Sequence, residues 1–290
     1  MQHEVIRHMI QKIRLSILLY LSIAIIASLV SSTYFGVANS QQNKTLMQSQ
    51  GTPGMTTTNA TNMNIILVHG TYVDGSSWSK VIPILQNAGH KVIAVQLPLH
   101  SLADDIATVK RAIDLVGAPV ILVGHSYGGF VITNAAYNNS NVKGLVYIAA
   151  FAPEEGQSLG NFVNLKKFPK GLLVFDKGGF VYINPEAFGQ VIAQDADPAQ
   201  VKVIAAAQKP FNQSILGEKS GPPAWKQLPS WYQVSENDHA IPPDAERLIA
   251  KQINATTISL RSSHGSPLSH PNEVAQLILD AANKLSGEGK

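Results

Sequence analysis

The sequence has no cysteine and few charged residues. The absence of cysteine from all 290 residues excludes disulfide bonds, so packing of a hydrophobic core must supply the stability of the fold. Charged residues make up only 14% of the chain and hydrophobic residues 45%, a balance typical of a folded domain rather than of extended disorder. The formal net charge of +3 comes without a basic patch, which argues against a nucleic-acid partner.

Two kinds of cofactor site are also missing from the sequence. The histidines after residue 40 have no spacing typical of metal ligation. No glycine-rich phosphate-binding loop is present, because Gly128-Gly129 belongs to the serine motif at residues 124–128. The sequence therefore predicts neither a metal nor another cofactor.

An apolar segment dominates the N-terminus. Three basic side chains precede a nearly uninterrupted apolar run over residues 15–30, and small residues at Ala38 and Ser40 follow where a signal peptidase would cut. Residues 1–40 are therefore predicted to be an export signal, with an uncleaved membrane anchor as the alternative. Both interpretations place the rest of the protein outside the cell, secreted or anchored to the outer face of the cell membrane. Residues 41–62, rich in Gln, Thr, Asn and Ser, are predicted to form a flexible linker.

From residue 63 onward, short apolar runs alternate with amphipathic stretches. This alternation is typical of a parallel sheet covered by helices. We predict an α/β fold with a doubly wound, mostly parallel sheet over residues 63–287, a length suited to one large domain. Residues 152–228 interrupt the alternation with many Phe, Pro and Gly residues, and they are predicted to form an inserted cap. The predicted strands are residues 64–69, 91–96, 119–123, 142–149, 231–235 and 256–260.

The most informative motif is Gly124-His125-Ser126-Tyr127-Gly128, which has the form G-x-S-x-G. An apolar strand precedes it and a helix-like stretch follows, the context of a nucleophile elbow. Such a turn is strained, and side chains at positions 124 and 128 would collide with the neighbouring backbone. The strain lifts the Ser126 hydroxyl above the sheet, within reach of a substrate and a base. The alternative is a glycine-rich turn without a catalytic role.

A nucleophilic serine needs a base and an acid that orients the base. For a serine in this motif, the acid and then the histidine follow in chain order. His264 comes after the last predicted strand and before the final helix, so it is the predicted base, and His270 is the structural alternative. Asp238 lies just after the strand at residues 231–235 and is the predicted acid, with Glu154 as the alternative.

The oxyanion that develops during acyl transfer needs hydrogen-bond donors placed in advance. The backbone N–H of Tyr127, at the start of the helix after Ser126, is one predicted donor. The second predicted donor is the N–H of Thr71, in the loop after the first strand, with that of Tyr72 as the alternative. Gly70 allows the backbone of this loop to approach the reacting atoms closely.

Six short segments carry a resemblance to a known family: Leu67-Val68-His69-Gly70, Gly75-Ser76-Ser77-Trp78, Gly124-His125-Ser126-Tyr127-Gly128-Gly129, Glu236-Asn237-Asp238, Ser263-His264 and Ser269-His270-Pro271. Over most of its length after residue 64, the chain resembles the α/β-hydrolase superfamily. Within it, the resemblance is to the small esterase branch of plant methylesterases, hydroxynitrile lyases and many bacterial and archaeal hydrolases. The resemblance implies the α/β-hydrolase fold and a Ser-His-Asp triad. Hydroxynitrile lyases of this type carry a threonine at the position of Gly70 and a lysine at that of Gly265, so the resemblance favours hydrolysis.

The predicted function is that of a serine hydrolase, a carboxylesterase that acts on a small, largely apolar ester through an acyl-enzyme. Ser126 is predicted to attack the ester carbonyl, and aromatic side chains of the cap to line an apolar pocket. One alternative is a ligand-binding protein without turnover. Another is a different chemistry on the same triad, that of a lyase, a cofactor-free oxygenase or a perhydrolase. The predicted partner is a small-molecule ester, with membrane attachment through residues 1–40 under the anchor interpretation.

Overall fold

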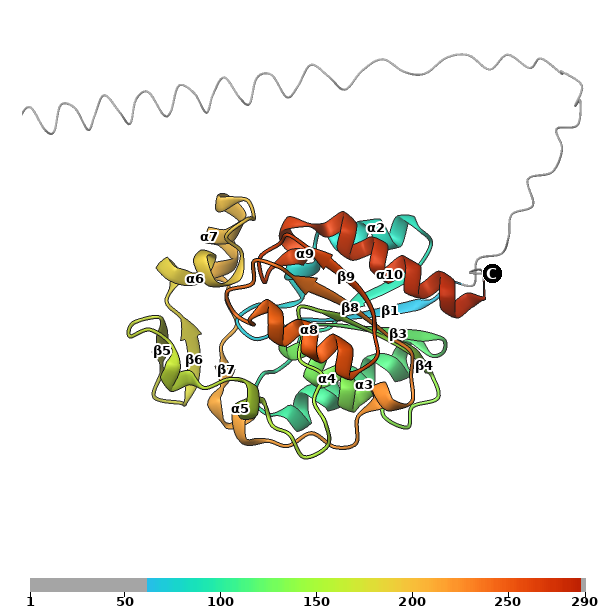
Figure 1. The fold of residues 1–290 in the computed structure, drawn as a ribbon, viewed down its shortest axis with the longest axis horizontal. Coiled ribbons are helices and arrows are strands. Elements are labelled where there is room, and N and C mark those ends of the chain that lie inside the picture. The colour runs from blue at the N-terminus through green and yellow to red at the C-terminus, as the bar shows by residue number, and fades with distance from the viewer. Residues whose placement is uncertain (1–61, 288–290) are drawn as a thin grey trace, which may run out of the picture. The chain divides into compact units, whose positions relative to one another are not determined.

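A six-stranded parallel sheet lies at the centre of the protein. The computed structural model describes residues 62–287. Its main sheet has the strand order β2-β1-β3-β4-β8-β9, and every neighbouring pair is parallel (Figure 1). From β1 the chain crosses to the edge strand β2 and returns past β1 to β3, so the predicted doubly wound sheet is confirmed. The strands are β1 Asn64–Val68, β2 Lys91–Ala94, β3 Val120–His125, β4 Val142–Ile148, β8 Ser230–Ser235 and β9 Thr256–Leu260.

The change of direction between β1 and β3 determines where a site can form. At such a point in an open α/β sheet, the loops at the carboxyl ends of the two strands diverge and leave a crevice. Here the loop after β1 contains residues 69–72, and Ser126 directly follows β3. The topology therefore brings together two segments that the sequence motifs predict to be functional.

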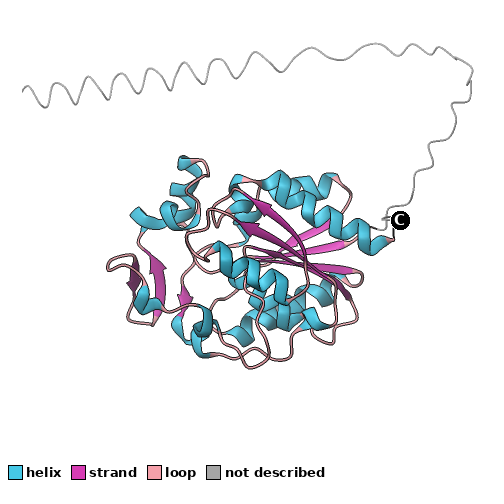
Figure 2. Cartoon of the chain, viewed as in Figure 1, coloured by secondary structure: helices cyan, strands magenta, loops and turns pink. Residues whose placement is uncertain are grey.

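Helices cover both faces of the sheet (Figure 2). Alternate residues of β1 point to opposite faces: Ile65 and Leu67 pack with α2 and α10, whereas Ile66 and Val68 pack with α3, α4 and α8. All four side chains are fully buried, which accounts for the uninterrupted apolar sequence of this strand. The helices are α2 Val81–Asn87, α3 Leu102–Val116, α4 Tyr127–Ala135, α8 Pro243–Gln252, α9 Ser266–Ser269 and α10 Pro271–Ser286, with a 3-10 helix at Gly75–Trp78.

The segment between β4 and β8 builds a separate layer, which we call the cap (left side of Figure 1). It contains a three-stranded antiparallel sheet of order β5-β6-β7 and the helix pair α6 and α7. Its apolar core includes Phe188 and Ile192, and Val73 and Leu268 of the main body join that core. The cap elements are α5 Leu159–Phe162, β5 Leu173–Phe175, β6 Phe180–Ile183, α6 Pro185–Ile192, α7 Pro198–Ala206 and β7 Phe211–Asn212, with 3-10 helices at Leu165–Lys167, Gln213–Gly217 and Ala224–Lys226.

The predictions for the N-terminus lie outside the described residues. This holds for the export signal or membrane anchor at residues 1–40, and for the linker at residues 41–62 apart from Asn62. Among the helices within residues 62–287, none combines the length and the apolar character that crossing a membrane requires.

Candidate active site

Ser126 occupies a strained turn between β3 and α4. Its backbone φ is 54° and its ψ is −123°, a positive-φ conformation that residues other than glycine rarely adopt. Glycine is required on both sides of it. A Cβ at Gly124 would lie 2.6 Å from backbone atoms of Gly128, and a Cβ at Gly128 would collide with the carbonyl oxygen of Val68. The turn closes only with these glycines, and it sets the Ser126 side chain at the carboxyl end of β3.

His264 and Asp238 form a buried pair in the loops after β9 and β8. Nδ1 of His264 lies 2.6 Å from Oδ2 of Asp238, and the two residues are 3% and 6% exposed. Oδ1 of Asp238 accepts hydrogen bonds from the amides of Ala240 (2.6 Å) and Ile241 (2.8 Å). Burial raises the pKa of Asp238, but the charge of His264 and the hydrogen bonds outweigh burial and hold this pKa below its ordinary value. The ionised carboxylate keeps a proton on Nδ1, which leaves Nε2 as the basic nitrogen.

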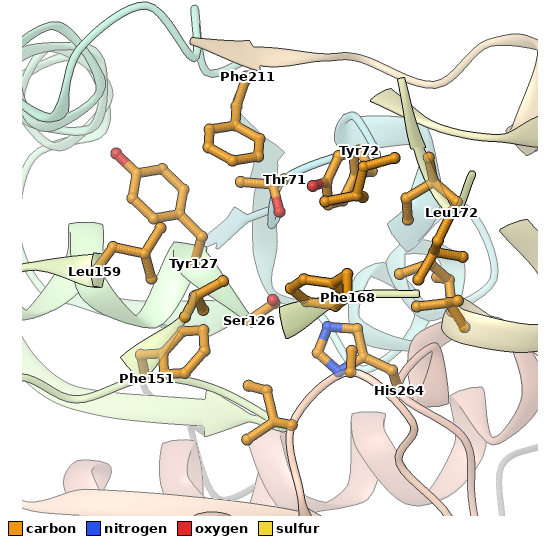
Figure 3. Close-up of a pocket in the computed structure, with 17 residues that line it drawn as sticks. Thr71, Tyr72, Ser126, Tyr127, Phe151, Leu159, Phe168, Leu172, Phe211 and His264 are labelled. Carbon is orange, nitrogen blue, oxygen red and sulfur yellow. The ribbon is translucent and has the colours of Figure 1, made fainter. Parts of the chain in front are cut away.

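Ser126 and His264 face one narrow cavity between the main body and the cap (Figure 3). The cavity is narrow, with a volume of about 60 Å³. Cap side chains such as Leu159, Phe168 and Leu172 form much of its wall. The 17 described residues that line the cavity include no Asp, Glu, Lys or Arg. The cavity is therefore suited to an uncharged, apolar ligand.

Two different contacts bring the three predicted triad residues together. Asp238 and His264 are hydrogen-bonded, and His264 shares the cavity with Ser126. Within residues 62–287, the Ser126 hydroxyl and the His264 imidazole are not hydrogen-bonded to each other. Catalytic hydrogen bonds of this kind are often long before substrate binds.

Thr71 and Tyr127, the residues whose amides are the predicted oxyanion donors, both line this cavity, and so does the alternative, Tyr72. Tyr127 is the first residue of α4, so its amide has no acceptor within the helix. Gly70 brings the loop after β1 against Ser126, since a Cβ at this position would lie 2.7 Å from the Cβ of Ser126. The close approach of this loop leaves room for amides but not for a side chain beside the serine.

Two further histidines near the site are engaged in structural hydrogen bonds. His69 contacts the carbonyl of Gly70 through Nδ1 (2.8 Å), and its Nε2 accepts from the amide of Leu97 (3.0 Å). His125 contacts the carbonyl of His264 through Nε2 (2.9 Å). Burial lowers the pKa of His69 to about 4 and that of His125 to about 3. Both rings are therefore neutral at physiological pH, and they hold the loops after β1 and β9 in place.

A buried aspartate that sequence analysis missed supports Tyr127. Oδ2 of Asp105 accepts a hydrogen bond from the Tyr127 hydroxyl (2.8 Å), and Oδ1 accepts one from the amide of Leu99 (2.8 Å). Asp105 is fully buried, and burial raises its pKa to about 6. It lies on the apolar stripe of α3 with Leu102 and Val109. In the sequence, the signal that could have identified Asp105 is an acidic residue at a core position of an amphipathic helix.

A second missed carboxyl group, that of Glu246, lies behind Asp238. Glu246 is fully buried on α8, on the same helix face as Ile249. Its Oε2 accepts a hydrogen bond from the amide of Ser235 (3.0 Å), and its Oε1 has no hydrogen-bond partner within the described part of the chain. Burial, and then the negative charge of Asp238, raise the pKa of Glu246 far above its ordinary value. Glu246 is thus a neutral, protonated group that adds no second charge beside the acid.

Glu154 and His270, the alternative acid and the alternative base, do not line the cavity. Glu154 forms a solvent-exposed ion pair with Lys226 at 2.6 Å. His270 directly precedes α10, and its Nδ1 contacts Oγ of Ser269 (2.9 Å). A Cβ at Gly265 would lie 2.8 Å from the carbonyl oxygen of Ile192, so a lysine does not fit there. No group of three or more His, Cys, Asp or Glu side chains in the described residues is placed to hold a metal ion.

Comparison with known proteins gives a consistent set of matches. The profile described as "Alpha/beta hydrolase family" matches residues 65–277. The chain is 24% identical to an alpha/beta hydrolase of Aspergillus novofumigatus over 76% of this chain and 96% of that protein. It is 25% identical to Methylesterase 8 of Arabidopsis thaliana over 77% and 90% of the two chains. The solved structure of a pyrethroid hydrolase from Sphingobium faniae JZ-2 superposes with a TM-score of 0.66 at 23% identity, over 77% of this chain and 98% of that one.

Proposed function

The chain belongs to the alpha/beta hydrolase family, and on that basis we propose that it is a serine carboxylesterase with Ser126, His264 and Asp238 as its triad. One observation carries the proposal. A serine in a strained turn and a buried His–Asp pair face the same uncharged cavity. The relatives are named as hydrolases and esterases, which supports ester hydrolysis as the reaction.

In the proposed mechanism, the Ser126 hydroxyl attacks the ester carbonyl while Nε2 of His264 takes its proton. The resulting oxyanion is stabilised by the amides of Tyr127 and Thr71, and a single donor of this type contributes about 100-fold to 1000-fold in kcat. Collapse of the tetrahedral intermediate breaks the bond to the alcohol, which leaves with the proton from Nε2. A water molecule, deprotonated by His264, then attacks the acyl-enzyme. This second step releases the acid and returns the proton to Ser126.

Asp238 has two tasks in this mechanism. It keeps Nε2 unprotonated before the attack, because its carboxylate binds the proton on Nδ1. It also stabilises the imidazolium that forms when Nε2 takes the proton. The two backbone amides at Oδ1 hold the carboxylate in one orientation throughout both steps.

The proposed substrate is a small neutral ester with apolar groups on the acyl and alcohol sides. The wall of the cavity offers no Lys or Arg to pair with an anion and no Asp or Glu to pair with a cation. An unpaired charge moved into such a space loses its hydration without compensation, at a cost of several kcal/mol. Charged esters of the same size should therefore be poor substrates.

The test uses the full chain and two esters of matched length, 4-nitrophenyl butyrate and mono-4-nitrophenyl succinate, which differ by a carboxylate. We expect kcat/KM for the neutral ester to exceed that for the anionic ester by about 100-fold or more. The Ser126→Ala variant should fold and release no nitrophenol above background. Turnover that persists in Ser126→Ala would remove Ser126 as the nucleophile. A wild-type chain that binds the neutral ester without hydrolysing it would instead be the ligand-binding protein considered from the sequence.

A further inference from the structure

One short segment of the cap, residues 190–195, is hydrogen-bonded to all four residues that flank the acid and the base. The segment comprises the end of α6 and the loop that follows it. Two of the bonds lie beside Asp238 and two beside His264. They join Gln190 O to His239 Nδ1 (2.9 Å), Gln194 Nε2 to Asn237 O (2.6 Å), Ile192 O to Gly265 N (2.6 Å) and Asp195 Oδ2 to Ser263 N (2.8 Å).

The contact between this segment and the histidine loop leaves no free space. A Cβ at Gly265 would lie 2.8 Å from the carbonyl oxygen of Ile192 and 3.1 Å from the Cβ of Ala193. Interiors packed this closely transmit displacement rather than absorb it. A shift of residues 190–195 therefore moves the backbone on which His264 is carried.

The same segment also contacts the space for substrate. Val191 and Ile192 line the cavity together with Ser126 and His264. Because the cavity is narrow, we expect a bulky acyl group to press against these two side chains. The segment thus contacts both the space for substrate and the loop that carries the base.

Asp195 makes the side-chain contact to the residue directly before the base. Its carboxylate is the recorded acceptor for the amide of Ser263, and Ser263 is fully buried. The Asp195 side chain is 27% exposed, and its other neighbour is Nδ1 of His270 at 3.6 Å. Hydrogen bonds to an ionised acceptor are stronger than those between neutral groups, so this contact fixes the histidine loop more firmly than a neutral acceptor would.

We propose that Asp195 is a positioning residue for His264: through the Ser263 amide it holds the base in line with Ser126, so that the placement of the cap controls the chemical step. The inference rests on the proposed function, since it assigns a role in the same reaction. Loss of this contact should lower kcat more than it raises KM, because Asp195 does not line the cavity.

The experiment compares Asp195→Ala with a matched control in the same loop, Asp197→Ala. Asp197 caps α7 by accepting from the amide of Gln200 (2.9 Å), so the control removes the same charge and one cap hydrogen bond without touching the histidine loop. With 4-nitrophenyl butyrate, we expect Asp195→Ala to lose kcat by on the order of tenfold and Asp197→Ala to lose less than about twofold. Asp195→Asn, whose amide oxygen still accepts from Ser263 but carries no charge, should recover part of the rate.

A spectroscopic measurement separates positioning from general loosening of the cap. The proton NMR signal of His264 Nδ1–H, shared with Asp238, should broaden or shift in Asp195→Ala and stay in place in Asp197→Ala. Should Asp195→Ala fail to fold, Asp195→Ser, which is too short to reach the Ser263 amide, carries the same expectation. Equal kcat values and equal NMR signals in the Asp195 and Asp197 variants would overturn the positioning role. A wild-type chain inactive on esters would overturn the proposed function instead.

Discussion

The substitution Asp238→Asn replaces one oxygen of the acid with an NH₂ group. The hydrogen bonds around Asp238 determine which way the new amide faces, and thereby the effect on catalysis. In the wild type, Oδ1 accepts from two backbone amides and Oδ2 faces Nδ1 of His264. Asparagine has a single acceptor oxygen, and the two amides keep that oxygen at the Oδ1 position. Its NH₂ group then faces His264 and donates to Nδ1. The imidazole must carry its proton on Nε2, where it can no longer accept the proton of Ser126.

The size of this effect follows from the loss of the general base. A histidine held in the wrong tautomer lowers kcat by about 10,000-fold in Ser-His-Asp enzymes, which corresponds to ~5 kcal/mol of transition-state stabilisation. KM should change far less, because Asp238 does not line the cavity. The fold should persist, since aspartate and asparagine have the same shape and the amide contacts remain.

The assay is steady-state hydrolysis of 4-nitrophenyl butyrate by the full chain, with Glu236→Gln as the matched control. Glu236 lies two residues before the acid, and its carboxylate forms a partly exposed ion pair with Arg247 at 2.8 Å. Exposed pairs of this kind contribute about 0–1 kcal/mol, so the control should keep kcat within about threefold of wild type. Circular dichroism is used to check that both variants are folded.

A kcat for Asp238→Asn within about tenfold of wild type would refute the role of Asp238 as the orienting acid. Loss of activity in Glu154→Gln would in addition identify the residue that orients the base. The alternative acid from the sequence would then be correct, although the structure pairs Glu154 with Lys226 on the surface.

Three further predictions concern the groups around the triad. Gly128→Ala should lower the unfolding free energy by about 3 kcal/mol or more, because its Cβ meets the carbonyl of Val68; an unchanged melting temperature would contradict this. Glu246 has a raised pKa, so the folded state binds its proton more tightly than the unfolded state and stability falls as pH rises. Glu246→Gln should flatten this fall in melting scans from about pH 5 to about pH 9, and a parallel pH profile would count against a protonated glutamate. Tyr127→Phe leaves Oδ2 of Asp105 without its partner and should cost ~1–3 kcal/mol in urea unfolding; no loss would show that water replaces the hydroxyl.

The sheet was predictable because its central strands are buried on both faces and are therefore almost entirely apolar. Residues 65–68 are apolar without interruption, and the structure packs Ile65 and Ile66 against opposite helical layers. The serine turn was predictable for a related reason. Only glycine fits at positions 124 and 128, so the turn can be recognised in the sequence from these two glycines.

The parts of the site that could not be predicted from the sequence depend on tertiary contacts. Glu246 and Asp105 are acidic side chains at core positions of helices, and only tertiary contacts with Asp238 and Tyr127 show what their carboxyl groups do. The cap carries no comparable pattern. Residues 190–195 meet the histidine loop across about 70 residues of sequence, through the Ile192 carbonyl and the Asp195 carboxylate. A backbone carbonyl imposes little on side-chain identity, and a single aspartate in a loop has no spacing that marks its distant partner.

The most direct test of the central claim is to react the folded full chain with a fluorophosphonate and to locate the adduct by mass spectrometry. Such reagents phosphonylate a serine only when a neighbouring base has activated it. We expect a single adduct on Ser126, absent in Ser126→Ala and formed much more slowly in His264→Ala. An adduct on another residue, or no adduct on a folded chain, would contradict the assignment of Ser126 as an activated nucleophile.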